Sequence, residues 1–113
     1  MTINELRTQH CRPLKGDQHL LEATQAGKLL DLLPGWEPGP DHKDIRKKFT
    51  FDNFMQALAF VNALGWIAER ENHHPDLELG WGRCLVCFST HDVGGLSMND
   101  FICAAKVQTL FND

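Results

Sequence analysis

The sequence contains no tyrosine and no apolar run long enough to cross a bilayer. The first residues, Met1 to Leu6, lack the apolar core of a secretion signal, so the cytoplasm is the expected compartment. Positive charge is also scarce, because the formal net charge is −4 over 113 residues. A duplex-binding domain usually presents a basic face to phosphates. We therefore expect no nucleic-acid partner and no membrane partner.

Cysteine is limited to four residues, and two of them have the spacing of a zinc knuckle or a redox pair, Cys84-Leu-Val-Cys87. This pair lies in a run typical of a strand, where side chains alternate between the two faces. Residues three apart then point to opposite sides. Small buried side chains are the favoured interpretation, and nothing else in the sequence supports a disulfide framework.

The chain is long enough for one domain with one core. Residues 1–18 are polar and mixed, and we predict an irregular arm preceding a domain at 19–113. Apolar spacing predicts a helix over about 19–33, ended by Pro34-Gly35. A hairpin should follow, with Trp36 on its first strand and alternating residues 45–51 on its second.

A long apolar helix is predicted next, with Asp52 as its N-cap and its end near Asn72. A second hairpin is expected over 77–91, turning at Gly80-Trp81-Gly82. The last helix has the strongest start signal, because Ser97 and Asp100 form a variant of the capping box. The predicted order is α-β-β-α-β-β-α. This indicates an α+β fold, a four-stranded antiparallel sheet with three helices on one face.

Three of the six histidines, His73, His74 and His91, lie in one stretch of the chain. Glu69 precedes His73 by four residues, so on a helix the two side chains share a face and the carboxylate should fix the imidazole. Pro75 disfavours helical geometry at the residue before it, so the chain should leave the helix in an extended conformation. Imidazoles titrate near neutral pH and supply roughly 10² to 10⁴ in rate as acid–base catalysts. That gain suffices for an easy elimination, such as loss of water from a carbon that also bears nitrogen.

Other interpretations of the same residues remain open. His73-His74-Pro75 is also a reasonable helix C-terminus, and Asp100 is fully explained as a capping carboxylate. Trp36 and Trp81 more often pack in a core or a hairpin than contact a ligand. A metal held by Glu69, His73 and His91 is a further alternative.

The ordered set of these residues resembles the pterin-4a-carbinolamine dehydratase family, in its bacterial branch. The resemblance covers roughly residues 20–111 and is carried by Glu69-x-x-x-His73-His74-Pro75, Trp81, Ser89-Thr90-His91, Gly95-Leu96-Ser97, Asp100 and Leu33-Pro34-Gly35-Trp36.

The resemblance implies dehydration of 4a-hydroxytetrahydrobiopterin to quinonoid dihydrobiopterin, which recycles the cofactor of aromatic amino acid hydroxylases. It implies no metal and no bound cofactor, and a homodimer or homotetramer. The expected catalytic residues are His73, His74 and His91. The expected supporting or substrate-binding residues are Glu69, Asp100, Trp36, Pro75, Ser89 and Thr90.

Our mechanistic hypothesis is that one imidazolium protonates the departing hydroxyl while a neutral imidazole receives a ring N–H proton. His73 and His74 are the expected main pair, with Glu69 orienting His73 and His91 assisting or binding the ring. Two alternative functions stay open: a pterin-binding paralogue, for example in molybdopterin metabolism, and a dimerisation cofactor of a transcription factor.

Overall fold

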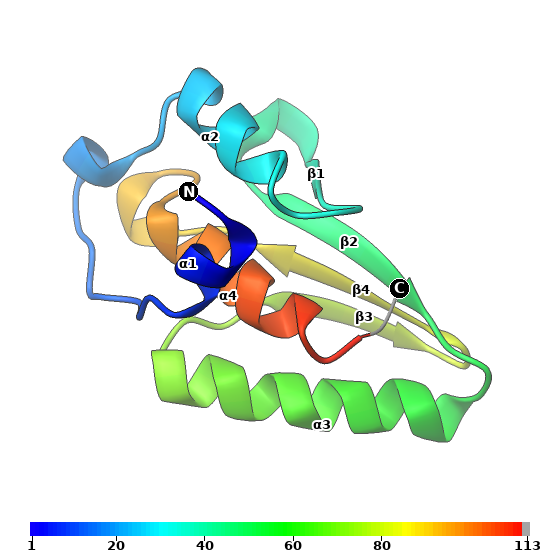
Figure 1. Ribbon diagram of the computed structural model, residues 1–113. Coiled ribbons are helices and arrows are strands. Elements are labelled where there is room, and N and C mark those ends of the chain that lie inside the picture. Colours follow the sequence, from blue (N-terminus) through cyan, green and yellow to red (C-terminus); the bar gives the residue numbers. More distant parts are fainter. Residues whose placement is uncertain (112–113) are drawn as a thin grey trace.

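The computed structural model describes residues 1–111, in which one antiparallel sheet is covered by helices (Figure 1). The strands β1 (Glu37–Pro38), β2 (Ile45–Thr50), β3 (Asp76–Gly80) and β4 (Arg83–Phe88) lie in the order β1-β2-β4-β3. The α-helices are α1 (Ile3–Arg7), α2 (Ala23–Leu30), α3 (Phe54–Glu71) and α4 (Met98–Gln108). Three 3₁₀ turns connect them: η1 (Asp17–His19), η2 (Pro40–His42) and η3 (His91–Val93). The predicted α+β class with a four-stranded antiparallel sheet is confirmed. The last two residues of the predicted 19–113 domain lie outside the described residues.

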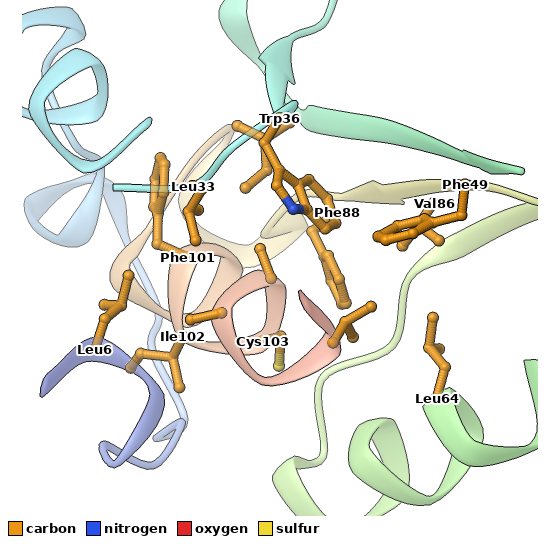
Figure 2. Close-up of a cluster of buried hydrophobic side chains, with 14 of the residues drawn as sticks. Leu6, Leu33, Trp36, Phe49, Leu64, Val86, Phe88, Phe101, Ile102 and Cys103 are labelled. Carbon is orange, nitrogen blue, oxygen red and sulfur yellow. The ribbon is translucent and has the colours of Figure 1, made fainter. Parts of the chain in front are cut away.

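One face of the central strands β2 and β4 carries the core. Ile45 lies opposite Phe88 and Phe49 opposite Cys84, and all four side chains are buried. Their strand neighbours on the other face are half-buried or exposed, as the period of two requires. Cys84 is accordingly buried while Cys87 is on the opposite face, and both are free thiols. Figure 2 shows the aromatic and aliphatic side chains of the strands meeting those of α4 and α3.

Helix α3 forms because its apolar residues recur every three or four positions. Ala57, Phe60, Leu64 and Ala68 are the residues that it buries. Its N-cap is Asn53, whose side chain accepts from the backbone N–H of Gln56 at 2.8 Å. The predicted N-cap Asp52 was therefore one residue early. Boundaries of this kind shift easily when two adjacent residues both suit the cap position.

Helix α4 begins as predicted. Ser97 is its N-cap, and the carboxylate of Asp100 accepts from the backbone N–H of Ser97 at 2.9 Å. Leu96 and Phe101, on either side of the cap, are both buried, as in a hydrophobic staple. The helix is thus fixed at the end that faces the loop after β4.

The N-terminal part of the chain differs from the prediction. Residues 1–18 were expected to be irregular, but they contain α1, which packs against α4 and buries Leu6 in the core. The first predicted helix, 19–33, is shorter and spans only α2. Glu22 and Gln25 begin it through a capping box, and Gly35, at φ 82°, turns the chain afterwards.

The two hairpins are present, but the ends of their strands differ from the prediction. Trp36 precedes β1 and does not belong to it, and β4 ends at Phe88, so His91 opens η3 instead of ending the strand. Trp81 and Gly82 form the predicted turn between β3 and β4. No helix within residues 1–111 is long and apolar enough to cross a membrane.

Candidate active site

The C-terminal end of α3 determines where the two adjacent histidines point. Asn72 takes a left-handed conformation (φ 50°, ψ 43°), and the backbone N–H of His73 donates to the carbonyl of Ala68 at 3.1 Å. This is a common way for a helix to end, with Asn in the position that glycine most often occupies. Pro75 then begins an extended segment that leads into β3. His73 and His74 therefore lie outside the helix and project in different directions.

His73 is held against the core. Its Nε2 lies 2.6 Å from Oδ1 of Asp100, and its ring stacks on Phe88 with 5.9 Å between centroids and 11° between planes. Only 11% of the His73 side chain is exposed, and Asp100 is fully buried. A carboxylate offers only acceptors, so Nε2–H donates to Asp100, and this contact does not use the other ring nitrogen, Nδ1.

Asp100 is the centre of a buried polar network. Its Oδ2 accepts from the backbone N–H of Ser97 at 2.9 Å and from the hydroxyl of Thr90 at 2.8 Å. The Ser97 and Thr90 hydroxyl oxygens lie 2.7 Å apart. Asp100 therefore caps α4 with one oxygen and holds His73 with the other. The capping explanation is correct, but it accounts for only one of the two carboxylate oxygens, because the other one contacts His73.

His74 makes the second imidazole–carboxylate pair. Its Nε2 lies 2.6 Å from Oε1 of Glu69, and both side chains are largely exposed, 54% for His74 and 74% for Glu69. We predicted that Glu69 would hold His73, and this was wrong. The prediction extended helical spacing to residue 73, whereas the left-handed turn at Asn72 rotates His73 toward Asp100 and leaves its neighbour beside Glu69.

The three histidines line one open hollow of about 270 Å³. His73 and His74 enter from the end of α3, and His91 enters from η3, which follows β4. Ser89, Thr90 and Asp92 complete the wall. Two short segments that are distant in the sequence thus bring imidazoles together around a space that a small molecule can reach.

The remaining predicted residues are placed differently. Trp36 is buried in the core, where its indole N–H donates to Gln108 at 3.0 Å and its ring packs near Phe49 and Phe88. It does not line the histidine hollow. Pro75 is half-buried and directs the chain out of the turn, and it does not line the hollow either.

Phe88 is a site residue that the sequence argument missed. Its ring stacks on that of His73. The sequence feature that could have indicated this role is the position of Phe88, immediately before Ser89-Thr90 on the core face of β4. Within residues 1–111, no three His, Cys, Asp or Glu side chains are positioned to hold a metal ion.

Comparisons with known proteins agree on one family. The family model described as Pterin 4 alpha carbinolamine dehydratase matches residues 19–110. A relative from Xanthomonas campestris is 52% identical over 95% of this chain and 91% of its own. One from Nitrosospira multiformis is 48% identical over 97% of this chain and 96% of its own. Both are named, provisionally, as pterin-4-alpha-carbinolamine dehydratases.

A solved structure also matches. It is described as a transcriptional coactivator/pterin dehydratase from Brucella melitensis. It superimposes with a TM-score of 0.77 at 27% identity, over 80% of this chain and 96% of its own.

Proposed function

The chain belongs to the pterin-4-alpha-carbinolamine dehydratase family, and we propose that it dehydrates 4a-hydroxytetrahydrobiopterin to quinonoid dihydrobiopterin by histidine acid–base catalysis. The observation that carries the proposal is the pair of imidazole–carboxylate contacts, each of 2.6 Å, beside one hollow. In this role the protein returns the pterin cofactor of aromatic amino acid hydroxylases to a form that can be reduced again.

The reaction is balanced by two proton transfers. An imidazolium gives its proton to the 4a-hydroxyl group, the C4a–O bond breaks, and water leaves. A neutral imidazole takes a proton from a ring N–H, and a carbon–nitrogen double bond forms. Each transfer needs a ring nitrogen that is free to face the ligand. The contacts with Asp100 and Glu69 occupy Nε2 of His73 and His74, so the exchanging atom in each ring is Nδ1.

The two histidines differ in a way that suits two tasks. His73 is clamped between Asp100 and the Phe88 ring, which fixes its orientation toward the ligand. His74 is more exposed and can exchange protons with water between turnovers. His91, at the far wall of the hollow, assists or binds the pterin ring. Positioned proton transfer of this kind contributes roughly 10² to 10⁴ in rate.

The direct test uses His73→Ala, His74→Ala and the double variant, with His19→Ala as the matched control because His19 does not line the hollow. Dehydration of a freshly generated 4a-hydroxytetrahydropterin is followed by its absorbance. We expect the double variant to lose most of the rate gain from acid–base catalysis, roughly 10² to 10⁴, and His19→Ala to keep the wild-type rate. A double variant that still works at the wild-type rate would exclude this mechanism.

We also propose that the protein acts as a homodimer or homotetramer joined through α3. Met55 and Trp66 are eleven positions apart on this helix, about three turns, so they share one outward stripe. Their side chains are 69% and 74% exposed, which is unusual for a large apolar pair on a monomer. A second copy packed on this stripe removes both from water.

A further inference from the structure

The histidine hollow is the first of three adjoining hollows. The second, of about 260 Å³, shares Ser89, Thr90 and His91 with it and adds Lys43. The third, of about 330 Å³, shares Lys43, Gly94 and Gly95 with the second. A ligand bound beside the histidines can therefore extend through the adjoining hollows toward α2.

The size of the first hollow limits what it can hold. Pockets that enclose whole small molecules occupy about 300–1,000 Å³. The histidine hollow, at about 270 Å³, lies just below that range. A flat bicyclic ring fits its size, and a substituent on that ring would extend beyond it, toward solvent or into the adjoining hollows. The adjoining hollows together offer more space than the histidine hollow itself.

The chemistry of the walls changes along the series. Lys43, Ser89, Thr90 and His91 give the middle hollow polar groups. The third hollow is lined mainly by apolar side chains from α2 and its surroundings: Leu20, Ala23, Ala26, Leu30, Pro38 and Leu96. A matching substituent is polar next to the ring and apolar at its far end. The dihydroxypropyl side chain of biopterin has this order, with two hydroxylated carbons followed by a methyl group.

Backbone hydrogen bonds fix the positions of segments that form these walls. The N–H of Leu21 donates to the carbonyl of Leu96 at 2.9 Å, and the N–H of Gly16 donates to the carbonyl of Asp92 at 3.0 Å. On the opposite wall, Asp41 and His42 both have positive φ angles, 59° and 54°. Such conformations are uncommon for residues with a Cβ and often mark functional loops.

We propose that the hollow between α2, η2 and the segment Gly94–Leu96 binds the distal, apolar part of the substituent on the pterin substrate. This inference rests on the proposed dehydratase function and extends it to substrate choice. The third hollow is larger than one methyl group requires, so pterins with longer alkyl substituents should be accepted. The pocket would thus select pterins by their side chain, separately from the histidines that act on the ring.

Gly27 is a position beside this hollow where a side chain can be added without disturbing the fold. It lines the third hollow, and a Cβ added there meets no atom within 4 Å. Gly27 lies within α2, so replacing it also removes a residue that weakens helices. Gly65 in α3 is a matched control, because its added Cβ also meets no atom within 4 Å and it lines none of the three hollows.

The experiment compares kcat/KM for 6-methyl and 6-butyl 4a-hydroxytetrahydropterins. The butyl compound has three additional methylenes, and each one that is buried is worth about fourfold in kcat/KM, so wild type should favour the butyl compound by up to about sixtyfold. Gly27→Leu should bring this preference to near one, Gly27→Ala should reduce it partly, and Gly65→Leu should retain it. A melting curve by circular dichroism checks that each variant is folded. No preference in wild type, or a preference that Gly27→Leu leaves intact, overturns the proposal.

Binding separates this proposal from the proposed function. The oxidised compounds 6-methylpterin and 6-butylpterin are fluorescent, and their affinities can be measured without turnover. If neither carbinolamine is dehydrated but 6-butylpterin binds more tightly and Gly27→Leu removes the difference, the reaction is wrong and the pocket stands. If dehydration is fast but neither kcat/KM nor binding affinity favours the butyl compound, the proposed reaction stands and the pocket assignment is wrong. If neither carbinolamine is dehydrated and 6-butylpterin binds no more tightly than 6-methylpterin, both the proposed reaction and the pocket assignment are wrong.

Discussion

Replacing Asp100 with asparagine tests whether its carboxylate serves the histidine or only the helix. The carboxylate accepts from Ser97 N–H, from the Thr90 hydroxyl and from His73 Nε2. Asparagine keeps one oxygen, which can stay on the Ser97 and Thr90 side. Its NH₂ group then faces Nε2 of His73. That nitrogen must become an acceptor, which moves the proton to Nδ1 and changes the tautomer.

The size of both effects follows from these contacts. A hydrogen bond to a charged group is worth about 1.5–3 kcal/mol, so the free energy of unfolding should fall by that amount. The rate should fall further, because the changed tautomer alters the protonation of Nδ1, the atom through which His73 is proposed to exchange a proton with the ligand. We expect kcat for dehydration to drop by at least about 10²-fold, within the usual contribution of a positioned acid–base group.

Ser97→Ala is the matched control, because Ser97 lines none of the three hollows. It removes the N-cap hydroxyl, which contacts Thr90 and accepts from the backbone N–H of Asn99, but keeps the Asp100 carboxylate and its contact with His73. It should cost about 0.5–2 kcal/mol of stability, because α4 loses its N-cap side chain. Its kcat should stay within a small factor of wild type. If Asp100→Asn loses stability in urea melts but keeps the wild-type kcat, Asp100 is a helix cap and nothing more.

Three further predictions concern other parts of the chain. Glu69→Gln should lower kcat by only about two- to fivefold in steady-state assays, because exposed ion pairs such as Glu69–His74 are worth at most about 1 kcal/mol. Burial opposes the charge on Glu71, but hydrogen bonds from the Cys11 N–H and from His10, together with the charge of Lys106, prevail and lower the pKa of Glu71. Its stabilising effect is therefore present above the ordinary carboxyl pKa and lost as pH falls through the lowered value. Urea melts should separate wild type from Glu71→Gln at pH 7, and the difference in unfolding free energy should shrink as the pH falls below the ordinary carboxyl pKa. Trp66→Glu should shift the protein to a monomer in light scattering, and an unchanged mass would place the interface elsewhere.

The elements that the sequence predicted well are those with local signals. The Ser97–Asp100 capping box and the turn at Trp81-Gly82 each depend on residues within a few positions of one another. Their physics is local, so the pattern is sufficient. The boundaries were less reliable, as the neighbouring cap candidates Asp52 and Asn53 show.

The features that the sequence did not predict depend on distant contacts. Helix α1 has only five residues, too few to be stable alone, and it exists because Leu6 packs into the core beside α4. The position of Trp36 has the same cause. Its indole N–H donates to Gln108, which is 72 residues later in the chain. No spacing near Trp36 indicates that partner.

The wrong partner for Glu69 shows how one backbone residue changes the chemistry of a site. Had α3 continued to His73, both Glu69 and His73 would lie on the exposed face, and Asp100 would be buried without a histidine. The left-handed turn at Asn72 instead assigns adjacent imidazoles to a buried and an exposed carboxylate. The two neighbouring imidazoles then differ in burial and in contact with water. For a reaction that gives one proton and takes another in each turnover, this difference is more useful than two equivalent histidines.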